Sequence, residues 1–154
     1  MSKPSNKTVV TKGPKKLITS EEVYKPVGPY SQAVLVDKTI YVSGVLGMDA
    51  SSNMKNGIEY QTKQALDNLK LILEAGDTSL KGVVKTTILM ADLEDFPVVN
   101  KIYSEYFPED FPARATYQVA KLPLNGLIEI EAIALAGVKG EPTVACPCSQ
   151  RSPC

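Results

Sequence analysis

Apolar residues follow a helical spacing in two segments of the chain. Over residues 59–75 they recur at i, i+1, i+4, i+7 and i+8, which predicts an amphipathic helix that ends at Gly76. A second helix is predicted over residues 95–107, because acidic residues precede it and Pro97 is tolerated in a first helical turn. Its apolar stripe consists of Phe96, Val99, Ile102, Tyr103 and Tyr106.

Runs rich in β-branched and aromatic residues predict six strands, and residues 44–57 are expected to form a loop. The spacing of Asp37-Lys38 suits a hairpin, and the turn dipeptide Asn125-Gly126 is expected to join the last two strands as neighbours. The order β-β-β-α-β-α-β-β predicts the α+β class, with a mixed sheet and two helices on one face. The predicted strands cover residues 17–19, 30–36, 39–43, 83–90, 115–121 and 127–136.

The last predicted strand is apolar on both of its faces. One face holds two isoleucines and three alanines, and the other holds Leu127, Glu129, Glu131, Ile133 and Leu135. Two helices cover only one face of a sheet, so the second face is expected to pack against other subunits.

A chain of 154 residues fits one domain. We expect a flexible N-terminal arm over residues 1–14, a domain over residues 15–137 and a flexible C-terminal tail over residues 138–154. No apolar run approaches the roughly 20 residues of a membrane-spanning helix. Residues 1–16 hold five lysines, two prolines and no arginine, which favours a cytosolic arm over a transit peptide. We therefore expect a cytoplasmic protein, with a mitochondrial or nuclear pool left open.

Charge and residue usage exclude several functions. Residues 1–20 hold five of the seventeen basic residues, so twelve basic residues stand against seventeen acidic ones in the rest. A nucleic-acid-binding face normally has the opposite sign, which disfavours RNA or DNA as the main partner. The chain has no histidine, which removes the commonest general base, the commonest metal ligand and every Ser-His or Cys-His scheme.

All three cysteines lie in the last nine residues, at Cys146, Cys148 and Cys154. The predicted domain therefore has no thiol nucleophile and no disulfide, which fits a reducing compartment. Cys146 and Cys148 could hold a soft metal, but a tail with free thiols is the preferred interpretation.

Glu129 and Glu131 share one face of an apolar strand and need partners, because a buried unpaired charge is costly. Arg114 is the best candidate, at the start of the strand that is expected to pair with the glutamate strand. One interpretation is a structural ion pair between Arg114 and a glutamate, for which Glu131 is the better candidate. In the other, Arg114 binds a substrate carboxylate through two hydrogen bonds, while Glu129 positions or deprotonates a water.

Three further candidates lie in or beside loops. A Gly-Pro-Tyr-Ser turn delivers Tyr30, which is either a site residue or a filler whose hydroxyl is satisfied locally. Ser43 and Gly44 close a strand, where a glycine lets a ligand approach the backbone. Asn100 lies on the polar flank of the second helix, where an asparagine is most often simply solvated.

Seven short motifs, in order over about residues 15–137, resemble the RidA (YjgF) family of reactive-intermediate deaminases. They are Gly28-Pro-Tyr-Ser-Gln-Ala33, Tyr41-Val-Ser-Gly44, Val84-Lys-Thr-Thr87, Val99-Asn100, Phe111-Pro-Ala-Arg114, Leu122-Pro123 and Ile128-Glu-Ile-Glu-Ala132.

The resemblance implies a chorismate-mutase-like α+β fold and a homotrimer with three sites between subunits. It also implies hydrolysis of 2-iminopropanoate and 2-iminobutanoate to 2-oxo acids and ammonia, with no cofactor and no metal. The matching positions give each residue an implied role. Arg114 binds the substrate carboxylate, helped by backbone N–H groups near Thr116 and Gly44, and Glu129 positions the water. Tyr30 is expected to be catalytic together with these two residues. The expected substrate-binding residues are Ser43, Gly44, Asn100, Arg114 and Thr116.

Two positions depart from the family pattern. Val45 stands where many members have Gln, so a polar contact is lost there or made elsewhere. Thr116 stands where bacterial members often have Cys, which agrees with hydrolysis by water rather than a covalent intermediate. Two other functions stay open: a ribonuclease or translation inhibitor, and a non-catalytic chaperone-like protein.

Overall fold

The computed structural model describes residues 7–140, which form one seven-stranded sheet, two α-helices and three short 3-10 helices. The α+β class is confirmed, and so is the expected amphipathic helix α1 (Ile58–Ala75), followed by α2 (Phe96–Tyr106). The strands are β1 (Lys7–Lys12), β2 (Lys15–Ser20), β3 (Ala33–Val36), β4 (Thr39–Leu46), β5 (Val83–Met90), β6 (Ala113–Gln118) and β7 (Ile128–Leu135).

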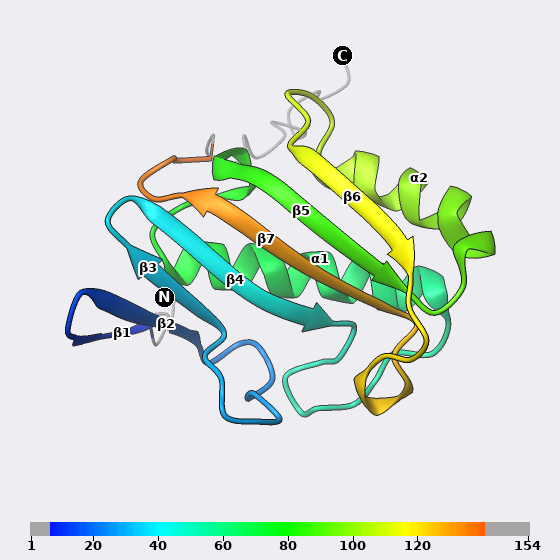
Figure 1. The fold of residues 1–154 in the computed structure, drawn as a ribbon, viewed down its shortest axis with the longest axis horizontal. Coiled ribbons are helices and arrows are strands. Elements are labelled where there is room, and N and C mark those ends of the chain that lie inside the picture. The colour runs from blue at the N-terminus through cyan, green and yellow to red at the C-terminus, as the bar shows by residue number, and fades with distance from the viewer. Residues whose placement is uncertain (1–6, 141–154) are drawn as a thin grey trace, which may run out of the picture.

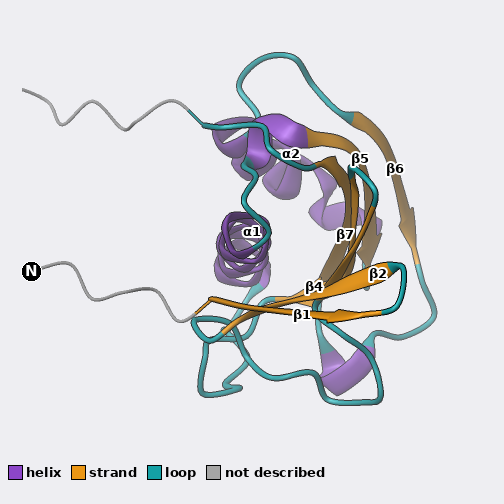
Figure 2. Ribbon diagram, turned by 90° about the vertical axis from the view of Figure 1, so that its left-hand side faces the viewer, coloured by secondary structure: helices purple, strands orange, loops and turns teal. Residues whose placement is uncertain are grey.

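The strands are hydrogen-bonded in the order β1-β2-β3-β4-β7-β5-β6. All neighbours are antiparallel except β5 and β6, which α2 connects as a parallel pair. Both helices lie on one face of the curved sheet, as the edge-on view in Figure 2 and the view in Figure 1 show together. The opposite face of the sheet, called here the open face, is not covered by either α-helix of residues 7–140.

The core lies between the sheet and the helices. The apolar stripe that the spacing predicted for the first helix is buried: Ala65, Leu66, Leu69, Ile72 and Leu73. Each such side chain stabilises the fold by about 1.5–3 kcal/mol relative to its exposed state. In β7 the residues that face the helices are buried, while Glu129, Ile133 and Leu135 alternate with them on the open face.

The open face exposes large apolar side chains. Tyr41 is 48% exposed, Tyr117 is 50% exposed and Leu135 is 47% exposed. Single exposed apolar residues are common, but several on one uncovered sheet face indicate a contact surface. The two-sided pattern predicted for the last strand is therefore present.

The expectation that the last two strands pair is wrong. β5 pairs with β6 on one side and with β7 on the other, so β5 separates the two strands. The reason lies in the topology: a helical crossover brings β6 alongside β5 as a parallel neighbour, and both edges of β7 are already occupied by β4 and β5. Asn125, with φ 56°, serves a turn that leads across β5 rather than a hairpin.

The strand limits also differ from expectation at the N-terminal side. Lys7–Lys12 pairs with β2 as an antiparallel strand, so the prediction of a loose arm is wrong for these residues. Tyr30 precedes β3 rather than lying in it, and β4 runs through Gly44 to Leu46 with a change of register between Val42 and Val45. Residues 1–6 of the arm and the three cysteines lie outside the described residues.

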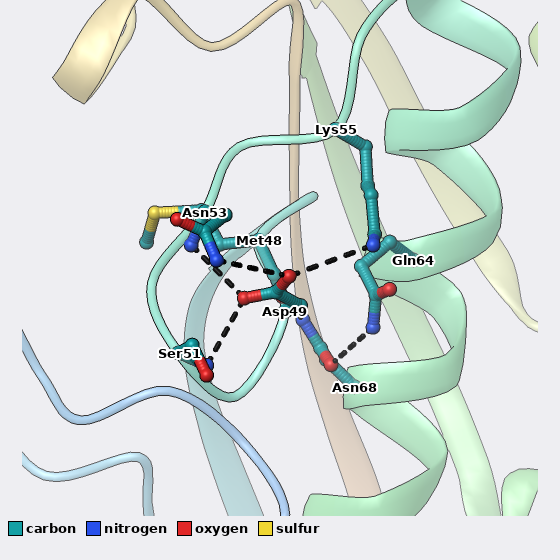
Figure 3. A network of polar contacts seen from close by, with 7 residues as sticks. All are labelled: Met48, Asp49, Ser51, Asn53, Lys55, Gln64 and Asn68. Atoms are coloured by element: carbon teal, nitrogen blue, oxygen red, sulfur yellow. Dashed lines mark hydrogen bonds and ion pairs between the residues drawn. The ribbon is translucent and has the colours of Figure 1, made fainter.

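The loop after β4 is held by its own polar groups. The Asp49 carboxylate accepts the backbone N–H groups of Ser51 and Asn53, each at 3.0 Å, and lies 3.6 Å from Lys55 (Figure 3). Asn68 on α1 donates to the carbonyls of Leu46 and Met48 at 3.1 and 2.8 Å. These bonds attach the end of β4 to the helix layer. Among residues 7–140, no helix combines the length and apolar character needed to cross a membrane.

Candidate active site

The carboxylate of Glu129 lies directly against the backbone of Gly44. A Cβ atom added at Gly44 would collide with the Glu129 carboxylate, so only glycine fits below it. The change of register in β4 creates this position, because Val45 pairs with Ile130 and Leu46 pairs with Glu129 beyond it. The sequence signal of a glycine at a strand end thus marks the approach of a side chain from the neighbouring strand.

Burial raises the pKa of the Glu129 carboxyl above its usual range, and the charge of Glu131, two positions along β7, raises that pKa further. The described residues offer this carboxylate no salt bridge. A half-buried carboxylate with a raised pKa is a suitable general base or water-positioning group near neutral pH.

Two more predicted residues, Tyr30 and Ser43, lie beside Gly44, and we call Tyr30, Ser43, Gly44 and Glu129 the glutamate group. Tyr30, Ser43 and Gly44 line one small crevice together with Tyr24. The Ser43 hydroxyl donates to the Ser31 carbonyl at 2.6 Å. The Tyr30 side chain is exposed, and its hydroxyl accepts the Val27 N–H at 3.3 Å, so part of its hydrogen bonding is satisfied locally.

Arg114 lies on β6 and its side chain is directed to the helix layer. Its guanidinium carbon is 4.9 Å from the ring centre of Tyr103 and 5.5 Å from that of Phe96, both on α2. Such stacking orients a guanidinium and leaves its N–H edge free for a carboxylate. The Arg114 side chain is exposed, and no salt bridge to it is found within residues 7–140.

Asn100 and Thr116 belong with Arg114, and we call these three residues the arginine group. Asn100 lies one turn from both Phe96 and Tyr103 on α2, so it shares the helix side that the guanidinium contacts. Thr116 is two residues after Arg114 on the same face of β6. Its hydroxyl oxygen is enclosed and has no hydrogen-bond partner among the described residues, which leaves it available to a ligand.

Within one chain the two groups face opposite sides of the sheet. Arg114 pairs with Thr86 on the helix face, whereas Glu129 pairs with Leu89 on the open face. The interpretation of an ion pair between Arg114 and Glu129 or Glu131 within one chain is therefore wrong. The physical reason is that side chains on opposite faces of a strand layer cannot meet across it.

Three residues of this region were not predicted as site residues. Phe96 and Tyr103 were assigned to an apolar stripe, although their spacing around Asn100 was a usable signal. Tyr24 lies in a loop with no periodic pattern, so no sequence signal identified it. Val45, the departure from the family pattern, is fully buried in the core.

Fold and site together define a two-layer α+β protein with a half-buried carboxylate against a glycine of its sheet and an arginine at the sheet edge that two aromatic rings support. A family model described as Endoribonuclease L-PSP matches residues 20–136. The chain belongs to this family, the RidA (YjgF) family.

Relatives and solved structures agree with this membership. The chain is 51% identical over 125 residues to a human 2-iminobutanoate/2-iminopropanoate deaminase, and the match covers 80% of this chain and 91% of that protein. It is 48% identical over 122 residues to the chloroplastic Reactive Intermediate Deaminase A of Arabidopsis thaliana, over 78% of this chain and 65% of that protein.

Two crystal structures are similar in fold. RidA from an Antarctic Psychrobacter bacterium is 42% identical with a TM-score of 0.75, covering 76% of this chain and 96% of that one. E. coli TdcF with bound serine is 30% identical with a TM-score of 0.75, covering 77% of this chain and 97% of that one.

Proposed function

We propose that this protein hydrolyses small 2-imino acids, such as 2-iminopropanoate and 2-iminobutanoate, to 2-oxo acids and ammonia. The observation that carries the proposal is the half-buried Glu129 carboxylate, which has a raised pKa and lies over a glycine. It is the kind of base that a chain without histidine needs. The deaminase names of relatives that are about half identical in sequence support the same activity.

The mechanism follows from the chemistry of the two groups. Arg114 binds the substrate carboxylate through parallel hydrogen bonds, which presents the protonated imine carbon beside it to Glu129. Glu129 accepts a proton as water adds to that carbon, and the resulting carbinolamine takes a proton on nitrogen and expels ammonia. Imines hydrolyse readily, so orientation supplies most of the required rate increase.

We further propose that the protein is a homotrimer whose sites lie between subunits. The exposed apolar side chains of the open face support an assembly, and so does a hollow of about 400 Å³ on that face, lined in part by Tyr41, Lys85, Glu131 and Ile133. The opposite orientations of Arg114 and Glu129 support a site between subunits, because the two side chains can meet only if they come from different chains.

Ammonia release from freshly generated 2-iminopropanoate tests the activity. Arg114→Ala is expected to lower kcat/KM by at least about 100-fold, because a bidentate contact to a charged group is lost. Lys121→Ala, which removes an exposed cation shortly after β6, is the matched control and is expected to behave as wild type. Unchanged turnover in Arg114→Ala would rule the mechanism out.

Light scattering during size-exclusion chromatography tests the assembly. Three copies of the 16.6 kDa chain give a particle of about 50 kDa. Leu135→Asp places a charge on the open face and is expected to shift the particle toward a single chain, whereas Lys139→Asp, beyond β7, is expected to leave it unchanged.

The family description also names an endoribonuclease, which makes RNA cleavage a second candidate. The excess of five acidic residues beyond residue 20 disfavours RNA as the main substrate. RNA cleavage that persists after extensive repurification and in Arg114→Ala would support this second function. A folded trimer that turns over no imine would instead support a non-catalytic, chaperone-like role.

A cytoplasmic location belongs to the same proposal. It is consistent with a site that uses no disulfide or thiol within the predicted domain, over residues 15–137. Fractionation of cells that express the full chain tests the location. Enrichment in mitochondria or plastids would contradict it.

A further inference from the structure

The edge of β4 that faces β3 loses its neighbouring strand after Val42. Ala33 is the last β3 residue in register, where it pairs with Val42, and the Ser43 N–H still reaches the Gln32 carbonyl at 3.0 Å. Leu46, three residues later, has no strand beside it on this edge. Its backbone groups are buried, and such groups need partners.

Two side chains supply those partners at Leu46. The Leu46 N–H donates to the Tyr24 hydroxyl oxygen at 2.8 Å, and the Leu46 carbonyl accepts from Asn68 at 3.1 Å. Figure 3 shows Asn68 projecting from α1 toward the loop that follows β4. Leu46 is also the register partner of Glu129, so the backbone opposite the glutamate is held by Tyr24 and Asn68 in place of a strand.

Tyr24 itself is firmly held. Its side chain is buried, and its backbone carbonyl accepts from the Gln32 side chain at 3.0 Å. Burial raises the pKa of the Tyr24 phenol to about 12, and Tyr30 and Glu129 add to that rise. The hydroxyl therefore stays protonated at physiological pH. It lines the same crevice as Ser43 and Gly44.

We propose that Tyr24 is a positioning residue for Glu129: its hydroxyl bond to Leu46 holds the shifted segment of β4, so that Gly44 stays beneath the carboxylate. The same bond bears on Val45, whose side chain can make no polar contact. The Tyr24 hydroxyl, which comes from another segment, binds the backbone N–H of the neighbouring residue Leu46 instead. The kinetic consequence rests on the proposed deaminase function, whereas the structural consequence does not.

The charged and titratable groups around Glu129 are few. Glu131 comes from β7 itself, and Tyr24 and Tyr30 come from the segment before β3. Lys85 comes from β5 and lines the same hollow as Glu131 on the open face. If the β4 segment loosens, water reaches Glu129 and the effect of burial weakens, so the pKa of Glu129 moves down toward its usual range.

Tyr24→Phe tests the proposal, because it removes the hydroxyl and keeps the buried ring. We expect kcat to fall by about fivefold to twentyfold while KM for 2-iminopropanoate stays within about twofold, since Arg114 still binds the carboxylate. The acid limb of the kcat profile is expected to move to lower pH. Tyr60→Phe is the control, since Tyr60 is an exposed tyrosine on α1 and should retain wild-type values.

Two measurements on the folded protein do not depend on activity. Amide exchange at Leu46 is expected to accelerate in Tyr24→Phe, and the carboxyl titration of Glu129, followed by NMR, is expected to move to lower pH. If the wild type turns over no imine but both changes occur, the proposed function fails and the positioning role stands. A Glu129 titration and an acid limb unchanged in Tyr24→Phe would overturn the positioning role, even if Leu46 exchanges faster or stability falls.

Discussion

Glu129 lies in the middle of the sheet, whereas Arg114 lies on its edge strand. The glutamate group is fixed by two neighbouring strands, a glycine that admits the carboxylate, and side chains that hold the backbone opposite. The arginine group is exposed and is oriented by two aromatic rings of one helix. This difference is what the proposed assembly requires: Glu129 would be positioned within its own chain, while the exposed Arg114 would reach a neighbouring subunit.

The largest expected effect concerns the separation of the two groups. Arg114→Ala and Glu129→Ala are each expected to be nearly inactive. When equal amounts of the two variants are refolded together, one of the three sites in each mixed form of the proposed trimer receives both intact residues. About one third of the wild-type activity should return per mixed trimer, and about one quarter for the whole mixture, because about a quarter of the trimers hold a single variant. Ammonia release from the mixture measures this recovery.

A mixture of Arg114→Ala with the double variant lacking both residues is the control and should stay inactive. If mass measurements prove that mixed trimers form and no activity returns, Arg114 and Glu129 do not act across a subunit boundary. That result would contradict the proposal that the arginine group and the glutamate group of one site come from different chains.

Gly44→Ala tests how strictly the Glu129 carboxylate of the glutamate group is held in position. The added methyl group must displace the Glu129 carboxylate, and displacing a catalytic group by about 1 Å can cost about 100-fold in rate. We expect a loss of that size in kcat, measured by ammonia release. Gly140→Ala is the control, because its added Cβ meets Ser79 at an ordinary 3.4 Å. Wild-type kcat in Gly44→Ala would show that the carboxylate has no strict position.

Phe96→Leu tests whether the aromatic rings of α2 orient Arg114 in the arginine group. Loss of one ring below the guanidinium is expected to raise KM by about twofold to fivefold with little change in kcat, because an exposed cation–π contact is worth about 0.5–1 kcal/mol. Steady-state kinetics on 2-iminopropanoate provide the measurement. Tyr60→Leu removes an exposed aromatic ring on the other helix and should leave KM unchanged. A fall in kcat alone would point to a role for Phe96 in the chemical step.

Glu131→Gln has the smallest expected effect. The Glu131 charge raises the pKa of Glu129, so its removal should lower that pKa, and the acid limb should move to lower pH. An NMR titration of the Glu129 carboxyl checks the direction. Glu94→Gln is an exposed control away from β7. Movement of the limb to higher pH would contradict the assigned cause.

Much of the fold follows from local pattern. The spacing around Leu66 and Leu69 identified α1, and the alternation along the last strand identified its two faces, because both signals reflect which side of an element meets the core. The position of β6 could not be predicted in this way. The sequence of residues 113–118 contains no local signal that β6 pairs with β5 rather than with β7.

In the candidate site, too, the local features could be predicted from the sequence and the long-range contacts could not. Glu129 was identified as a carboxylate in an apolar strand and Gly44 as a glycine at a strand end, and each signal was local. That the first lies over the second depends on a register shift in β4, which the sequence of β4 alone does not reveal. Tyr24 escaped notice because its importance arises from one contact with a residue 22 positions away.

The sequence by itself determined the residue types available for chemistry, the helices, the two-sided last strand and the family. Periodicity and motifs are properties of residues that are close in sequence, so they can be recognised without the tertiary structure. The tertiary structure decided which strands are neighbours, and therefore that Arg114 and Glu129 face opposite sides of one sheet. Side-chain direction depends on register and strand order, and these are fixed only when distant segments pack together.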